Sequence, residues 1–156
     1  MKISDKIKLY GGLLISKNGE EPVEIQNIVC SVGRQKLASH AATLANAQYW
    51  FSHLAVGSGI LPASTEDLAL DDEIYRVQFD SIFASNYTVY GTVEITGLMI
   101  DAYVGVGPGV GEYFLTEWGL MDSLTGGNLI CHQVPDYQFD VQGDDILEII
   151  WGVIIT

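Results

Sequence analysis

The chain has 156 residues, a formal net charge of −13, and 48% hydrophobic residues against 17% charged ones. This length predicts one domain with a sizeable core. The acidic balance argues against nucleic acid as a partner, because the protein would repel phosphate. The most apolar window, residues 146–155, contains Glu148 and is too short to span a bilayer as a helix, so no membrane partner is expected.

The charges are distributed unevenly along the chain. Residues 1–36 contain six Lys or Arg against four acidic residues, whereas residues 37–156 contain one arginine against sixteen acidic residues. The chain is rich in apolar residues and poor in charged ones, and charge-poor apolar surfaces are typical of the centres of protein interfaces. We therefore expect a homo-oligomer, with a trimer as the preferred oligomeric state. We interpret residues 1–21 as a basic arm or hairpin, in which Lys2, Lys6 and Lys8 attach to an acidic surface.

The first part of the chain predicts a hairpin followed by a helix. Apolar residues alternate with lysines from Ile3 onward, Asn18-Gly19 is a hairpin turn signal, and residues 23–29 alternate again. Residues 33–46 change to helical spacing and predict one short α-helix, with Ser31 as its N-cap. His40 falls on the apolar face of this helix, where we expect a hydrogen-bonded histidine instead of a metal ligand.

Residues 51–77 predict a strand, a tight turn and a loop that leads into the next strand. The strand ends at Gly57-Ser58-Gly59, where glycines are expected to supply a positive φ, and Pro62 prevents the strand from continuing. We interpret Gly57, Gly59 and Pro62 as a structural hinge.

The remainder of the chain predicts strands, because β-branched and aromatic residues dominate it and turn residues interrupt it. The expected strands cover residues 74–84, 87–95, 98–104, 113–121, 128–133, 137–141 and 146–155. Short strands at this spacing indicate a mainly β fold, an antiparallel β-sandwich or flattened barrel. The last strand reads as a central one that is buried on both faces.

Arg76 is the only cation beyond residue 36, and a lone cation among so many carboxylates is expected to be paired. Glu73 is near in sequence, and Glu117 lies in a strand that pairs alongside in this interpretation. We predict a structural ion pair that joins Arg76 to Glu73 and Glu117 and fixes the hinge to the sheet.

The glycine-rich loop at residues 105–111 does not fit a nucleotide-binding motif. It contains Gly105, Gly107, Pro108, Gly109 and Gly111, but it lacks G-x-G-x-x-G and no helix is expected after it. We interpret it as a hairpin loop that serves as a contact surface.

No catalytic or cofactor motif is recognised elsewhere, so we expect a protein that is not an enzyme and holds no cofactor. Ser58 lacks the glycines of a nucleophile elbow, since Val56 and Ile60 occupy their positions. The acidic residues between 66 and 73 do not have EF-hand spacing. A weak cation site that they form together with residues 144–145 is the alternative interpretation. Cys30 and Cys131 are expected to be free and buried, with a disulfide as the alternative.

The sequence resembles virion structural proteins of tailed bacteriophages, of the tail fibre-like or tail-associated kind. The resemblance covers roughly residues 22–156 and excludes the basic start of the chain and the glycine-rich loop. Its motifs are HLAVGSG followed by Pro62, Thr65, Leu70, Glu73 and Arg76; Asn27 and Gly33 within residues 23–37; TEWGLMDSLTGGNLICHQVP; and the closing GDDILEIIWGVIIT.

The resemblance implies a non-enzymatic, oligomeric component of the tail, neck or fibre apparatus, located in the virion after assembly in the host cytoplasm. Other virion proteins would then be partners besides further copies of the chain. A capsid-surface decoration or head-fibre protein is the first alternative. A module that recognises a host-surface glycan through loop aromatics is an alternative of another class.

Overall fold

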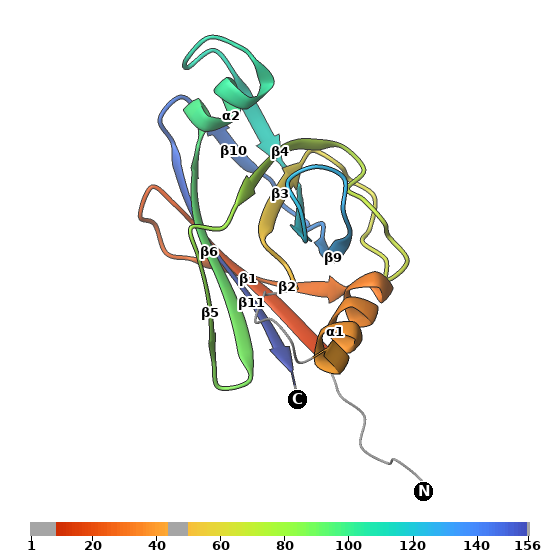
Figure 1. Cartoon of the computed structure of the whole chain (residues 1–156). Coiled ribbons are helices and arrows are strands. Elements are labelled where there is room, and N and C mark those ends of the chain that lie inside the picture. Colours follow the sequence, from red (N-terminus) through yellow and green to blue (C-terminus); the bar gives the residue numbers. More distant parts are fainter. Residues whose placement is uncertain (1–8, 44–49, 156) are drawn as a thin grey trace, which may run out of the picture.

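The computed structural model describes residues 9–43 and 50–155, and the fold is mainly antiparallel β, as predicted (Figure 1). The strands in the described residues are β1 (Leu9–Lys17), β2 (Val23–Val29), β3 (His53–Gly57), β4 (Glu73–Gln78), β5 (Ser81–Ser85), β6 (Thr88–Thr96), β7 (Glu112–Leu115), β8 (Glu117–Met121), β9 (Leu129–Gln133), β10 (Phe139–Gln142) and β11 (Ile146–Ile155). The helices there are α1 (Ser31–Thr43) and α2 (Gly97–Val104).

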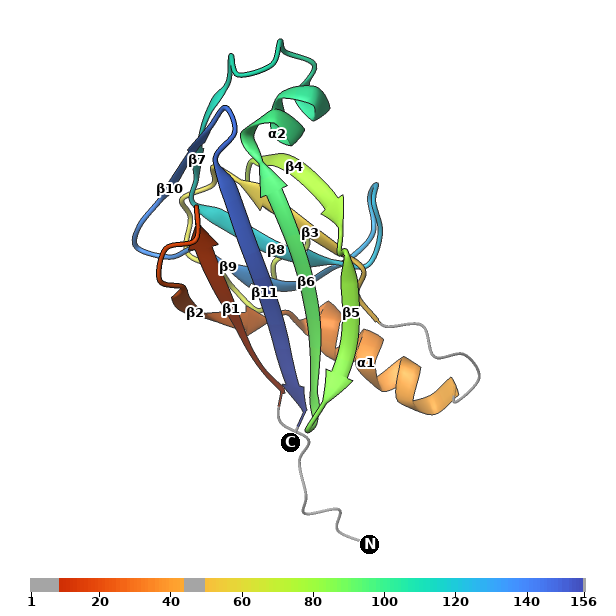
Figure 2. The same cartoon turned by 90° about the vertical axis from the view of Figure 1, so that its left-hand side faces the viewer.

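Nine of the strands form one curled sheet in the order β4-β3-β8-β9-β2-β1-β11-β6-β5, and β10 and β7 form a small second sheet. The strands at the two ends of this order, β4 and β5, follow one another in the chain and are separated by Phe79 and Asp80 alone. The sheet is therefore curled, and the end of β4 and the start of β5 lie next to each other at a corner formed by Phe79 and Asp80. Figure 2 shows β4 and β5 leaving the corner in different directions.

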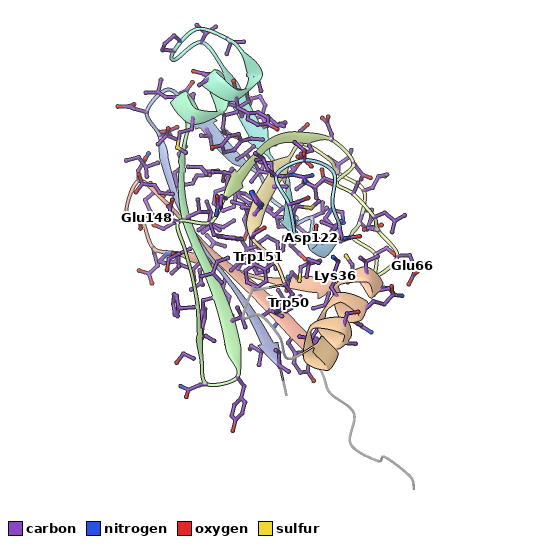
Figure 3. All side chains as sticks on the ribbon, viewed as in Figure 1. Lys36, Trp50, Glu66, Asp122, Glu148 and Trp151 are labelled. Atoms are coloured by element: carbon purple, nitrogen blue, oxygen red, sulfur yellow. The ribbon has the colours of Figure 1, made fainter. Side chains whose placement is uncertain are left out.

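The core lies inside the curl of the large sheet; β8 is buried at all five positions, whereas the long strand β11 points alternate residues into the core. β11 illustrates the alternation: Leu147, Ile149, Trp151 and Val153 are buried, whereas Ile150 is 41% exposed. Trp151 points into the interior and Glu148 lies on the opposite, outer side of the sheet (Figure 3). The prediction that β11 is a central strand is confirmed, but the prediction that both of its faces are buried is wrong.

The second helix, α2, replaces the strand predicted at residues 98–104. The Thr96 hydroxyl accepts a hydrogen bond from the backbone N–H of Met99 at 3.2 Å, which caps the start of the helix. Gly105 ends it with a φ of 81°, a left-handed conformation that favours glycine. These end signals outweigh the apolar, β-prone composition of the segment between them.

Two predicted strands are each divided in the structure. Residues 74–84 form β4 and β5 at opposite edges of the large sheet. Residues 113–121 form β7 in the small sheet and β8 in the large one, with Thr116 between them. The Thr116 hydroxyl donates to the carbonyl of Gly59 at 2.8 Å, so tertiary contacts set this break.

Helix α1 is confirmed near its predicted place, although residues 44–46 and the His40 side chain lie outside the described residues. Ser31 is already the first residue of the helix, and its hydroxyl donates to Glu66 at 2.8 Å instead of acting as the expected N-cap. Lys36 of α1 forms an ion pair of 3.0 Å with Asp122, and Figure 3 shows these two side chains close together. Cys30 and Cys131 are free and buried.

β1 lies between β2 and β11, so residues 9–17 belong to the centre of the large sheet. A turn at Asn18-Gly19, both with positive φ, leads from β1 toward β2. The separate arm predicted over residues 1–21 is therefore wrong for residues 9–17, which belong to the sheet. The residues before Leu9, including Lys2, Lys6 and Lys8, lie outside the described part of the chain.

This position of β1 predicts different outcomes for two truncations. Deletion of residues 1–21 removes β1 and leaves β2 and β11 without the strand that joins them, so the chain is expected not to fold. Deletion of residues 1–8 keeps every contact among the described residues and is expected to leave the melting temperature close to that of the full chain. Circular dichroism with thermal unfolding measures both, and a folded 22–156 fragment would contradict the prediction.

Candidate functional site

A buried carboxylate lies at the centre of the hinge region. Glu117, the first residue of β8, has no exposed surface. Its carboxylate accepts backbone hydrogen bonds from Gly59 at 3.2 Å, Asp71 at 2.6 Å and Asp72 at 3.1 Å. It also contacts Nε2 of His132, on β9, at 3.0 Å. One side chain thus joins both ends of the loop between β3 and β4 to two adjacent strands.

His132 lies between two carboxylates. Its Nδ1 contacts Asp67 at 2.6 Å and its Nε2 contacts Glu117 at 3.0 Å, while the residue is 1% exposed. Burial alone would lower the pKa of His132, but the hydrogen bonds to Glu117 and Asp67 outweigh it and hold the pKa above its ordinary value. With a carboxylate at each ring nitrogen, the protonated form of His132 donates to both Asp67 and Glu117.

Glu117 is correspondingly held as a carboxylate. Burial alone would raise its pKa, but the hydrogen bond from His132 and those from the backbone of Asp71 and Asp72 lower the pKa below its ordinary value. In the cluster formed by Asp67, His132 and Glu117, both ring nitrogens of His132 and the Glu117 carboxylate thus have partners within the chain. Its histidine has no nitrogen left to take a proton from a substrate, so the cluster fits a structural role better than general base catalysis.

The hinge glycines are explained by close packing against Glu117. Gly57 and Gly59 do not have the positive φ that was expected, so that prediction is wrong. A Cβ on Gly59 would come within 2.4 Å of the Glu117 Oε2 atom, and one on Gly57 would come within 2.3 Å of the Asp72 carbonyl oxygen. Only glycine lets the chain pass the buried carboxylate at this distance.

Two other features of the hinge differ from the sequence interpretation. Pro62 is exposed in the loop, five residues beyond the end of β3, and does not itself end the strand. The Ser58 hydroxyl donates to the Asp72 carboxylate and is not directed at a histidine. Ser58 and His132 therefore do not form the nucleophile and base of a hydrolase.

The structure brings Arg76 and Glu73 together but places Glu117 elsewhere. Arg76, 7% exposed, donates from Nε and Nη2 to the two carboxylate oxygens of Glu73 at 2.8 and 2.6 Å. Its Nη1 donates to the carbonyls of Ser123 and Gly126 at 3.0 and 2.6 Å, so the arginine also fixes the loop between β8 and β9. Within the described residues, the ionic partner of Glu117 is His132.

The glycine-rich loop has an anchor that the sequence did not reveal. Asp101 of α2, 1% exposed, accepts hydrogen bonds from the backbone of Gly109 at 2.6 Å and Gly111 at 3.1 Å, and from the Tyr113 hydroxyl at 2.7 Å. The hydrogen bond from Tyr113 holds the pKa of Asp101 below its ordinary value. The loop is therefore fastened at its C-terminal half, while Val110 is 73% exposed near its tip.

The outer face of β1, β11, β6 and β5 carries the candidate assembly surface. Residues that pair directly across these strands point to the same side, and many of them are apolar and exposed: Tyr10 pairs with Ile154, and Leu14 with Ile150. We call this surface the outer face and define it by Tyr10, Leu14, Phe83, Tyr90, Ile150 and Ile154. Gly12 and Gly152 pair at its centre and leave a hollow of about 230 Å³.

Comparisons with known proteins add no relative. No protein-family model matches the chain, and neither curated proteins nor solved structures yielded a match. Among the described residues, no cluster of His, Cys, Asp or Glu side chains is arranged to hold a metal ion. No helix in that same part of the chain has the length and hydrophobicity needed to cross a membrane.

The cluster of Asp67, His132 and Glu117 predicts that stability falls as the pH rises above about 6.5. The pKa of His132 is raised on folding, so its contribution is complete below the unfolded-state pKa and is lost as the pH rises through the native one. The pKa of His53 is lowered mainly by burial, and this contribution does not change above about pH 6.5. Urea denaturation at about pH 6 and about pH 8.5 measures the difference.

His132→Gln is the matched control for this pH dependence. It leaves Glu117 buried without its cation, so it should lower the free energy of unfolding by about 3 kcal/mol near pH 6. It should also remove most of the difference between the two pH values. An unchanged pH dependence in this variant would assign the effect to another group.

Asp101→Asn is predicted to release the glycine-rich loop without unfolding the core. The amide presents only one acceptor oxygen to the N–H groups of Gly109 and Gly111, which now share the two carboxylate oxygens. Limited thermolysin digestion with mass spectrometry should show several-fold faster cleavage within residues 103–111. Tyr113→Phe, which removes one of the three hydrogen bonds, should give a smaller increase, and equal rates in all three proteins would contradict the anchoring role.

Proposed function

We propose that the chain is a non-enzymatic structural subunit of a tailed-bacteriophage particle, in its tail, neck or fibre apparatus, and that it assembles with copies of itself through the outer face. The observation that carries the assembly role is the exposed apolar outer face on a strand-rich domain. The phage context rests on the sequence resemblance and would place the protein in the virion, with other virion proteins as further partners.

The size and position of the outer face support an interface. Exposed aromatic and aliphatic side chains continue across four neighbouring strands: Tyr10 is 52% exposed, Phe83 45% and Ile154 39%. Scattered exposed hydrophobic residues are normal, but a contiguous patch marks an interaction site. The hollow at Gly12 and Gly152 is lined by Leu14, Ile150 and Ile154 and provides a recess for a side chain of the partner.

The charges around the outer face indicate the kind of surface that fits it. Glu94 and Glu148 pair directly across β6 and β11, and like charges in this position repel one another. Glu24 pairs with Leu14 at the border of the patch. The described residues of this face include no Lys or Arg, so a partner with an apolar centre and a basic rim fits it best. Lys2, Lys6 and Lys8 of a neighbouring copy supply such a rim, in line with the attachment role proposed for the basic arm.

Two alternatives remain proposals. A capsid-surface decoration or head-fibre protein would use the same outer face. A host-surface glycan module is favoured by a separate feature, a hollow of about 650 Å³ lined by Thr116, Asp136, Tyr137 and Gln138 together with Ile60, Pro62, Val134 and Pro135. An exposed aromatic ring beside carboxylate, amide and hydroxyl groups suits sugar binding, but this hollow does not account for the apolar outer face.

The proposed function predicts that the chain self-associates and that Ile150→Lys weakens the association at least about tenfold in Kd, because a charge would be buried in the apolar interface. Size-exclusion chromatography with light scattering should give at least about three times the 17.0 kDa chain mass. Leu124→Lys is the matched control, because Leu124 is also exposed (52%) but lies in the loop between β8 and β9. A native chain that stays monomeric at high concentration would contradict the proposal.

A further inference from the structure

We propose that β5 pairs with β5 of a second copy in antiparallel orientation, so that two large sheets continue into one across a two-fold axis at Phe83. This contact goes beyond the proposed function, because its hydrogen bonds are made by the free backbone edge of β5 and not by the side chains of the outer face. β5 is the last strand in the sheet, and its hydrogen-bonded neighbour among the described strands is β6 alone. Figure 2 shows it at the border of the sheet, along the whole hairpin that it forms with β6.

The β5 edge lacks the features that normally prevent strand pairing between molecules. Natural edge strands are protected by charged residues, proline, bulges or a covering element. β5 reads Ser-Ile-Phe-Ala-Ser, contains neither a charge nor a proline, and pairs with β6 without a register shift. Four of its five residues are exposed.

The other edge of the sheet shows the contrast. β4 carries Glu73 and Arg76, and it packs against α2, where the rings of Tyr75 and Tyr103 make an edge contact with centroids 5.1 Å apart. One edge of the same sheet is thus charged and partly covered, while the other is neutral and open. This difference selects β5 as the pairing edge.

The sequence of β5 identifies a second copy of the chain as the occupant. In a two-fold antiparallel pair centred on Phe83, Ser81 lies opposite Ser85 of the second copy, Ile82 opposite Ala84, and Phe83 opposite itself. The strand is therefore close to a palindrome of polar and apolar residues. No like charges oppose one another in this register, although each copy has a net charge of −13.

The same register extends the outer face. Ser81, Phe83 and Ser85 pair with Thr92, Tyr90 and Thr88 of β6, so all six side chains lie on the outer side of the sheet. Phe83 stacks on Tyr90 with ring centroids 5.2 Å apart, and the two-fold axis would bring two such stacks together. A three-fold contact through the outer face and a two-fold contact through β5 are compatible in one dihedral hexamer.

A pair of double variants tests the contact and its register on the full chain. Ser81→Lys with Ser85→Lys places lysines opposite lysines at both ends of the pair, whereas Ser81→Glu with Ser85→Lys places opposite charges there. Light scattering should show the first variant losing a factor of two in assembly mass and the second keeping the native mass. Native mass in the first variant would overturn the edge contact. Equal dissociation of both variants would overturn the proposed register.

A crosslinking experiment tests the β5 contact without depending on how the lysine variants fold. Opposed residues of an antiparallel pair lie within disulfide range, so Phe83→Cys should form a dimer on oxidation. Ala84→Cys faces Ile82 of the second copy and should crosslink poorly. The native Cys30 and Cys131 are buried and do not compete. Equal crosslinking at both positions, or none at position 83, would contradict the two-fold axis.

The outcomes separate this contact from the outer-face contact. Ile150→Lys alone should leave the β5 dimer, and the repulsive double variant alone should leave the outer-face oligomer. Combining the three substitutions should give the monomer. Ile150→Lys therefore tests the outer-face contact, and the repulsive double variant tests the β5 contact separately.

Discussion

The hydrogen bonds of the Glu117 carboxylate hold together the part of the fold where the chain is least regular. The loop from Ser58 to Asp72 contains no helix or strand, yet both of its ends are bound to one side chain. A buried carboxylate is costly unless it is fully paired, and here three backbone N–H groups and the His132 ring supply the pairing. The backbone N–H groups need the carboxylate as well, because without it they would be buried with no hydrogen-bond acceptor.

This fastening leaves exposed apolar residues on an ordered loop. Ile60 is 78% exposed and Leu68 is 70% exposed, but the backbone between them is fixed through Asp67 and its bonds to His132 and Ser64. A loop held in this way keeps a defined surface without a hydrophobic core of its own. Because Asp67 holds the loop through its contact with His132, the protonation of this histidine makes the attachment of the loop depend on pH.

The sequence predicted those parts of the fold that depend on local pattern, and it missed those that depend on distant contacts. The extent of β11, the position of α1 and the turn at Asn18-Gly19 follow from composition and periodicity. The break at Thr116 does not, because its hydrogen bond goes to Gly59, which is 57 residues away. The helical capping of α2 by Thr96 and Gly105 was present in the sequence, but the apolar residues between them were read as a strand.

The site residues divide in the same way. Arg76 and Glu73 are three residues apart, and their pairing could be anticipated from spacing and charge. The partner of Glu117 could not be identified, because His132 becomes its neighbour only when β8 pairs with β9. Asp101 gave no sequence signal either, since its role depends on the loop folding back over α2.

The distribution of charge over the sheet connects the buried cluster with the assembly surfaces. Ionised groups lie at the hinge and at the β4 edge, where Glu117, His132, Arg76 and Glu73 are paired within the chain. The outer face has only acidic residues at its border, and β5 has no charge. For a protein with a net charge of −13, contact between copies is least unfavourable where carboxylates are absent. The apolar centre of the outer face and the β5 edge are such places, so the two proposed contacts lie where electrostatic repulsion between copies opposes them least.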